Sequence, residues 1–119
     1  MEIVNFEAYR RPNGHIEFNE WLQSLPRKDQ DKLLSLLVDI QEHGLLPAQR
    51  MQWIKKLDNN LFELRSKTGN NIQRALYFHV EHGRYIITHG FTKKTQKTPL
   101  KEINHAKSLR EEWYEYYGK

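Results

Sequence analysis

The 119-residue sequence contains no cysteine. Disulfide scaffolds, thiol nucleophiles and cysteine-ligated zinc are therefore excluded, and a reducing cytoplasm is the compartment that we expect. Long apolar runs are also missing. The longest, Leu33 to Ile40, is interrupted by Ser35 and Asp39 and is far too short to cross a bilayer. The sequence also lacks a P-loop, a dinucleotide-binding glycine motif and a serine-hydrolase motif. We expect no cofactor, no bound metal and no membrane association.

What the sequence does contain is typical of a folded protein. Hydrophobic residues make up 38% of the chain and aromatic residues 12%, more than a disordered segment carries. A chain of 119 residues has the usual length of one domain and can bury one core. We therefore expect a single domain that spans residues 1–119.

The positive charge is concentrated in one part of the chain. The formal net charge is +4, but the segment 65–101 holds eight cations and only one acid, Glu81. Eight minus one is +7 there, so the rest of the chain sums to −3. This asymmetry favours a polyanionic partner, with a solvated basic face as the alternative. The eight cations are Arg65, Lys67, Arg74, Arg84, Lys93, Lys94, Lys97 and Lys101.

Side-chain spacing predicts an α+β fold with a helical hairpin packed on a small antiparallel sheet. Gly44 is the expected stop of the second helix, and Thr98 and Pro99 are typical of the N-cap and first position of a last helix. In chain order, we expect a strand over residues 3–9, helices over 15–25 and 26–43, a connection over 46–60 with a short helical turn near 51–57, strands over 61–67, 71–81 and 84–91, and a C-terminal helix.

The strand over residues 61–67 separates apolar from charged side chains. Because successive side chains point to opposite faces of a sheet, Phe62 and Leu64 point toward the helices. Glu63, Arg65 and Lys67 then point to the other face. One face of the sheet is therefore expected to carry cations in register.

The neighbouring strands are expected to add aromatic groups to this face. Alternation lets Tyr77 and His79 share the face of Arg65 and Lys67. Strict alternation puts Arg74 on the core side, but twist or a bulge near the start of its strand can re-aim it. The third strand is expected to place four residues on one face, namely Tyr85, Ile87, His89 and Phe91.

This combination of residues suits single-stranded RNA. Cations hold phosphates and aromatic rings stack on bases, and residues 92–98 add three ammonium groups and several hydroxyls. RNA also supplies its own nucleophile, the 2′-OH. A base can deprotonate it, cations can stabilise the charged transition state, and an acid can protonate the leaving 5′-oxygen, all without a metal.

Three residues are candidates for the proton transfer. His89 has a side chain whose ordinary pKa is near neutral, although a histidine in a strand is more often structural. Lys93 and Lys94 are the alternatives if crowding of like charges lowers the pKa of one lysine. Taken singly, Lys67, Lys97 and Lys101 are most simply solvated surface residues.

Three stretches carry a resemblance to a known family. They are Leu61-Phe62-Glu63-Leu64-Arg65, then Arg74 with Tyr77-Phe78, and then the run from His89 to Pro99. Together they closely resemble the phage-derived HigB-like toxins of the RelE/ParE superfamily. The resemblance implies the toxin of a type II toxin–antitoxin pair, with a helix-turn-helix antitoxin as partner in a hetero-oligomeric complex. It also implies a metal-independent endoribonuclease that cuts mRNA at the ribosome.

The resemblance also implies roles for individual residues. Arg65 and Arg74 match the arginine positions that hold and stabilise the phosphate, and His89, Lys93 or Lys94 would move the protons. Residues expected to contact RNA around them are Lys67, Tyr77, Phe91, Lys97 and Lys101.

Two other functions stay open at this point. One is a ParE-like toxin that inhibits DNA gyrase by protein binding, and the other is a non-catalytic binding module of the same fold. The nuclease hypothesis predicts that Arg65 and Arg74 face outward with His89 nearby. Burial of these arginines in ion pairs would weigh against it.

Overall fold

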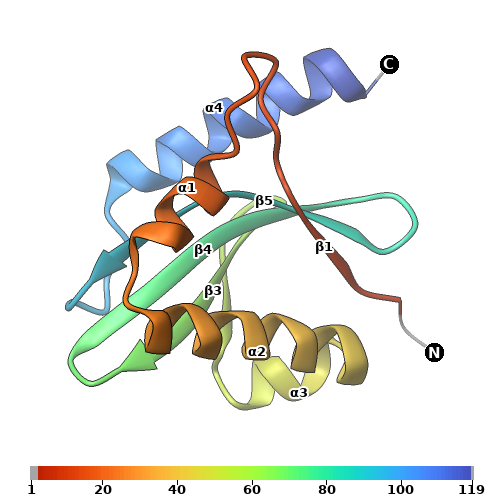
Figure 1. Ribbon diagram of the computed structural model, residues 1–119. Helices are drawn as coiled ribbons and strands as arrows, with labels where there is room; N and C mark the ends of the chain where they lie inside the picture. Colours follow the sequence, from red (N-terminus) through yellow and green to blue (C-terminus); the bar gives the residue numbers. More distant parts are fainter. Residues whose placement is uncertain (1–2, 119) are drawn as a thin grey trace.

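A computed structural model describes residues 3–118, so the first two residues and the last one of the expected domain lie outside the described part (Figure 1). In that part, four helices cover one five-stranded sheet, which confirms the predicted α+β class. The elements are β1 (Asn5–Ala8), α1 (Glu17–Ser24), α2 (Arg27–His43), α3 (Leu45–Arg50), β2 (Ile54–Asp58), β3 (Leu61–Thr68), β4 (Asn71–Val80), β5 (Arg84–Lys93) and α4 (Leu100–Tyr117).

The sheet has the strand order β1-β5-β4-β3-β2. Strands β2 to β5 form an antiparallel meander, and the predicted strands β3, β4 and β5 are the centre of the whole sheet. The expectation of a wholly antiparallel sheet is wrong at one edge, because β1 pairs in parallel with β5, with Asn5 opposite Arg84. Strand direction depends on which edge the first strand reaches, and local sequence does not encode that.

The predicted connection over residues 46–60 is in fact a helix and a strand. Ala48 of α3 is buried in the core, and its carbonyl accepts a 2.9 Å hydrogen bond from the Trp53 backbone N–H. Strand β2 then pairs with β3 at the edge of the sheet. Because Lys55 and Lys56 are exposed and only Ile54 and Leu57 are half-buried, this edge strand lacks the apolar pattern of an interior strand.

Both faces of the sheet are covered (Figure 1). The predicted hairpin of α1 and α2 packs on one face, and α4 packs on the other. The core on the hairpin face includes Phe18, Leu22, Leu33, Leu37, Ile40, Leu64, Ala75, Tyr77, Tyr85 and Ile87. The core on the α4 face includes Leu61, Leu76, Phe78, Ile86, Phe91, Ala106, Leu109 and Trp113.

A bulge in β5 moves side chains between these faces. Leu76 lies opposite His89 while Tyr77 lies opposite Ile87, so Thr88 is one extra residue in β5, and its hydroxyl donates to the Leu76 carbonyl at 3.1 Å. Tyr85 and Ile87 therefore belong to the hairpin core, whereas His89 and Phe91 point toward α4. The prediction that these four residues share one face is wrong, because a bulge reverses the alternation.

We predict that Gly90 cannot be replaced without cost. A Cβ at this position would lie 2.2 Å from Cε3 of Trp21, whose indole packs directly on β5. Gly90→Ala should lower the free energy of unfolding by about 1–3 kcal/mol, the usual cost of overpacking, as measured by urea denaturation. Combining it with Trp21→Leu should cost less than the sum of the two single changes. An unchanged stability of Gly90→Ala would contradict this packing.

Candidate functional site

The two predicted arginines are direct neighbours across β3 and β4. Arg65 and Arg74 are paired in register, and both side chains lie on the α4 face with Glu63. Arg65 Nε donates to Glu63 Oε1, and Arg74 Nε lies 3.8 Å from the same oxygen. Arg65 keeps 18% of its side chain exposed, whereas Glu63 and Arg74 are fully buried. One buried carboxylate is therefore the shared counter-charge of both guanidinium groups, and the cluster stays positively charged.

The connection between β5 and α4 closes over this cluster. Arg74 Nη2 donates to the Thr95 carbonyl, and Arg65 donates to the Gln96 carbonyl at 2.7 Å and to its side-chain oxygen at 3.1 Å. The Thr98 hydroxyl donates to Glu63 Oε2. Thr98 is therefore not the predicted N-cap. Pro99 takes that place without a side-chain cap, because the Thr98 side chain is engaged by Glu63.

Arg74 is in a setting that is costly for a cation. Burial lowers the pKa of Arg74, while the charge of Glu63 raises it and that of Arg65 lowers it further. Within the described residues, Arg74 Nε and Nη1 have no hydrogen-bond partner, and its Cζ lies 6.0 Å from the centroid of the Phe91 ring. The orientation of Arg74, which the sequence left open, is inward, because α4 and its leading segment cover that face, and this burial weighs against the nuclease hypothesis.

His89 lies in the interior, between β5 and α4. Its Nε2 is 3.1 Å from Glu102 Oε1, its Nδ1 is 3.1 Å from the Thr88 hydroxyl, and its ring is 4.8 Å from that of His105. Burial lowers the pKa of His89, with the Glu102 hydrogen bond acting in the opposite direction. The side chain is 6% exposed, so solvent scarcely reaches it. The ring of His89 stacks on Phe91 with a centroid distance of 5.9 Å, and Phe91 in turn lies against the guanidinium group of Arg74.

The two aromatic residues predicted to contact RNA are also buried. Tyr77 lies on the hairpin face, packed between Phe6, Phe62 and Tyr85, and burial raises the pKa of its phenol. Its predicted place beside Arg65 is wrong, because the in-register pairing of Arg65 with Arg74 puts odd-numbered residues of β4 on the opposite face. Phe91 does share the α4 face, but it is 7% exposed. Neither ring presents a surface on which a base could stack.

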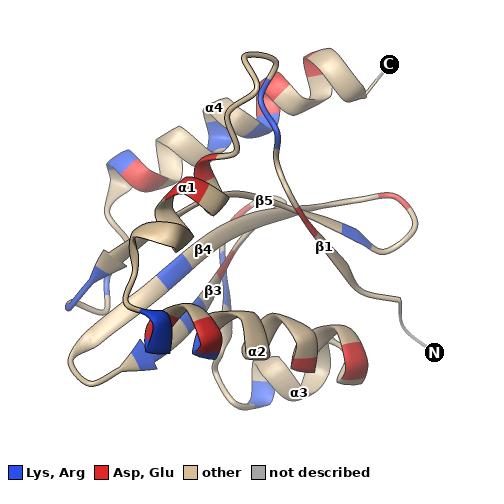
Figure 2. Ribbon diagram, viewed as in Figure 1, with Lys and Arg blue, Asp and Glu red and all other residues tan. Residues whose placement is uncertain are grey.

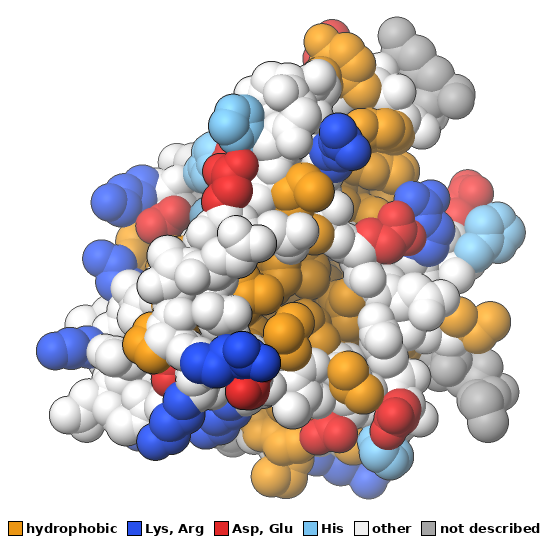
Figure 3. Space-filling view, in the orientation of Figure 1, with side chains coloured by type: hydrophobic (Ala, Val, Ile, Leu, Met, Phe, Trp, Pro, Cys, Tyr) orange, Lys and Arg blue, Asp and Glu red, His pale blue; other side chains and the backbone are white. Residues whose placement is uncertain are grey.

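The predicted lysines are accessible and gather at one end of the molecule. Figure 2 and Figure 3 show Lys and Arg concentrated where the β3–β4 turn, the β5–α4 connection and the start of α2 lie. Lys93 is half-buried there, and the exposed members are Lys67, Lys94, Lys97 and Lys101. The charge asymmetry of the sequence is therefore also an asymmetry of the surface.

Sequence reasoning missed two groups of polar residues. Glu63 was placed on the right face, but its role as the common partner of both arginines follows only from its burial. Asp39, Glu42 and His43 each bring one potential metal-ligating atom within 4.8 Å of the others, a cluster that was not predicted. All three are exposed on the last turns of α2, where such clusters are common without a metal. No helix within residues 3–118 combines the length and apolarity that a bilayer crossing demands.

The family described as "Phage derived protein Gp49-like (DUF891)" matches residues 20–111. The chain belongs to this family. The match runs from α1 into α4 and includes every candidate site residue.

The fold of this Gp49-like protein is similar to that of a RelE protein. The crystal structure of the archaeal RelE–RelB complex from Pyrococcus horikoshii OT3 contains a chain with 18% sequence identity and a TM-score of 0.51. The similarity covers 81% of this chain and 98% of that one. No curated protein sequence matches the chain.

We predict that Glu63 is required for stability because it neutralises Arg74. Glu63→Ala leaves a fully buried cation without a counter-charge, which should lower the free energy of unfolding by about 3–5 kcal/mol in chemical denaturation. Replacing both partners by apolar residues, Glu63→Leu with Arg74→Met, should recover much of that loss.

The matched control is Arg27→Ala, which breaks the exposed Arg27–Asp31 ion pair of α2. Exposed pairs of this kind contribute about 0–1 kcal/mol. If Glu63→Ala cost no more than Arg27→Ala, the buried carboxylate would not be the organising charge of the site.

We also predict a pH dependence from His89. Because its pKa is lowered in the folded state, the unfolded chain binds a proton there more readily. The contribution of neutral His89 is complete above the ordinary histidine pKa of about 6.5 and is lost as pH falls through the lowered folded-state pKa. Lowering the pH from above about 6.5 to below the folded-state pKa should therefore reduce the midpoint of thermal unfolding.

His89→Gln should flatten this dependence, whereas His43→Gln, at an exposed position on α2, should leave it unchanged. Equal slopes for the parent and His89→Gln would show that His89 is not the titrating group.

Proposed function

We propose that this Gp49-like protein is a HigB-like toxin of a type II toxin–antitoxin pair and inhibits translation by cutting mRNA at the ribosome. The observation that carries the proposal is the pairing of Arg65 with Arg74 beside the basic connection that follows β5. The family membership and the RelE-like fold support it. In this proposal residues 1–119 form one toxin domain, which acts in the cytoplasm and is neutralised by a helix-turn-helix antitoxin.

The chemistry requires only groups that RNA and this site supply. The 2′-OH loses its proton to a base and attacks the adjacent phosphorus, and the 5′-oxygen leaves with a proton from an acid. Arg65 and Arg74 would stabilise the extra negative charge of the transition state. Among the three candidates for proton transfer, exposed Lys94 and half-buried Lys93 are better placed to meet RNA than buried His89.

RNA would reach Arg74 only after the β5–α4 connection has moved aside. That connection is held by the carbonyl oxygens of Thr95 and Gln96, which accept hydrogen bonds from the two arginines. Phosphate oxygens accept the same bonds and also carry the negative charge that the neutral carbonyls lack, so they attract the guanidinium groups more strongly. A phosphate can therefore replace the carbonyls as the partner of both guanidinium groups.

A ParE-like toxin that inhibits DNA gyrase by protein binding is the second candidate. The burial of Arg74 against Glu63 favours it, because an arginine in a buried ion pair is typical of a structural role. The end of α4 also presents three exposed tyrosines, Tyr114, Tyr116 and Tyr117, and an exposed aromatic patch is typical of a protein interface.

The test is induction of the chain alone in a bacterial host, with growth followed while new mRNA 5′ ends are mapped. We expect growth arrest with cuts inside codons of translated messages. Arg65→Gln should abolish the cuts, because it removes the more accessible of the two phosphate-binding groups while the buried Glu63–Arg74 pair remains.

Circular dichroism of the purified Arg65→Gln protein separates loss of activity from loss of fold. Growth arrest without new mRNA ends, together with accumulation of broken DNA, would replace the nuclease by the gyrase inhibitor. Normal growth of cells that contain the folded protein would rule out both toxins and leave a binding module.

A further inference from the structure

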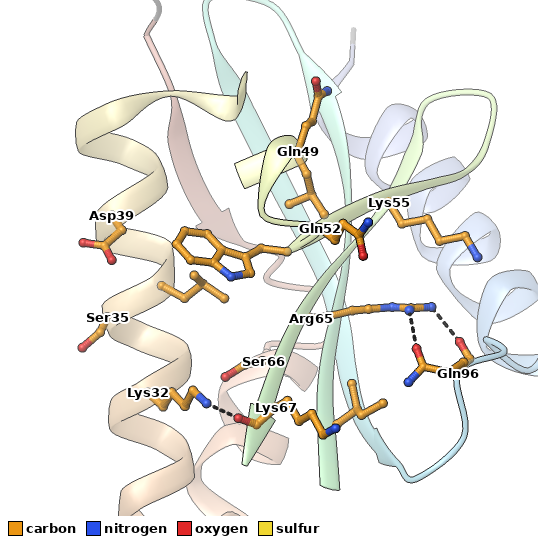
Figure 4. Close-up of a pocket in the computed structure, with 14 residues that line it drawn as sticks. Lys32, Ser35, Asp39, Gln49, Gln52, Lys55, Arg65, Ser66, Lys67 and Gln96 are labelled. Atoms are coloured by element: carbon orange, nitrogen blue, oxygen red, sulfur yellow. Dashed lines mark hydrogen bonds between the residues drawn. The ribbon is translucent and has the colours of Figure 1, made fainter. Parts of the chain in front are cut away.

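A groove of about 670 Å³ opens beside the arginine pair, between α2, β2 and β3 (Figure 4). It exists because β2 pairs only with Leu61–Leu64 of β3. The backbone N–H of Arg65 donates to the Trp53 carbonyl at 2.7 Å, and beyond it no strand among the described residues covers that edge of β3. The volume falls within the roughly 300–1,000 Å³ of sites that hold small ligands.

The walls of the groove are cationic. Four of its lining residues carry positive charge, namely Lys32 from α2, Lys55 from β2, and Arg65 and Lys67 from β3. The Lys32 ammonium donates to the Lys67 carbonyl and so links α2 to the open edge of β3. Asp39 is the one acid that lines the groove among the described residues, and it lies on α2, across the groove from Lys55 and Arg65 (Figure 4).

Groups that recognise planar and polar ligands lie between these cations. Trp53 is half-buried and lines the groove, and three amide side chains accompany it, those of Gln49, Gln52 and Gln96. Ser66 is 2% exposed, and its hydroxyl has no hydrogen-bond partner within residues 3–118. In Figure 4 this hydroxyl points from β3 toward the space beside Lys32. This hydroxyl is therefore available to a molecule that enters the groove.

We propose that this groove binds single-stranded RNA, with a base stacked on Trp53 and the neighbouring phosphates held by Lys55, Arg65 and Lys67. This inference rests on the proposed function and extends it to the path of the substrate. Arg65 lines the groove and also contacts the Glu63–Arg74 cluster. The next phosphate of an RNA strand bound in the groove would therefore lie near Arg74.

The lining favours a single strand of nucleic acid over other anions. Stacking on Trp53 requires an exposed base face, which a duplex does not offer. Amide side chains pair with the edges of such a base. An acidic peptide would use the same lysines but would leave the indole and the amides without a planar partner.

The decisive comparison uses the neighbouring residues Lys55 and Lys56. Both are exposed on β2, but only Lys55 lines the groove. The affinity of the purified protein is measured for a short, fluorescein-labelled single-stranded RNA by anisotropy over a range of salt concentrations. Each ribose of this RNA carries a 2′-O-methyl group, which removes the nucleophile and prevents cleavage. Lys55→Gln should reduce the slope of log affinity against log salt by about one, the effect of losing one phosphate contact. Lys56→Gln should leave the slope unchanged.

Trp53 provides an independent test of stacking. Trp53→Leu should weaken binding about tenfold, and Trp53→Phe, which keeps an aromatic ring, should retain most of the affinity. Thermal unfolding of both variants shows whether either change acts through stability.

Equal effects of Lys55→Gln and Lys56→Gln, or unaltered affinity in folded Trp53→Leu, would overturn the assignment of the groove even if mRNA is cut in cells. Groove-dependent binding without cutting would support the groove and overturn the nuclease. A further outcome is that the variants leave RNA binding unaffected and weaken only the binding of an acidic peptide. That result would make the groove a protein interface and refute the proposal.

Discussion

The buried carboxylate of Glu63 is the constraint on which this end of the molecule depends. It accepts from Arg65 and Thr98 and balances the charge of Arg74, so it joins β3, β4 and the start of α4 at one point. A buried charge is tolerated only when it is paired and hydrogen-bonded. Loss of one member of this cluster would therefore leave a buried charge of another member without its partner. The position of the β5–α4 connection, and with it access to the arginines, follows from this cluster.

The covering of both sheet faces determines where function can lie. The α1–α2 hairpin takes the apolar face, and α4 covers the face on which the arginines lie. Free polar surface is left at one end of the sheet, around the β5–α4 connection and the open edge of β3 (Figure 2, Figure 4). The accessible cations, the groove and the partly exposed Arg65 meet there, so a polyanion would approach from that side.

The interior strands and the long helices could be predicted because they carry strong periodic signals. The stripe that includes Leu33, Leu37 and Ile40 identified α2, and Gly44 ends it with a φ of 87°. Strand β2 could not be predicted, because an edge strand with two exposed lysines has no apolar alternation. The grouping of Tyr85 and Ile87 with His89 was wrong for a different reason: the Thr88 bulge is one unpaired residue, which alternation along a strand cannot detect.

The sequence by itself determined the α+β class, the hairpin and meander, and the concentration of cations between Arg65 and Lys101, because these depend on local spacing and composition. Only the tertiary structure decided which charged groups are available. Arg74 is buried and Lys94 is exposed although both lie in the same basic segment. Burial depends on which element covers a face of the sheet. The residue pattern of the strands does not show that α4, which follows them in the chain, covers the face of Arg74.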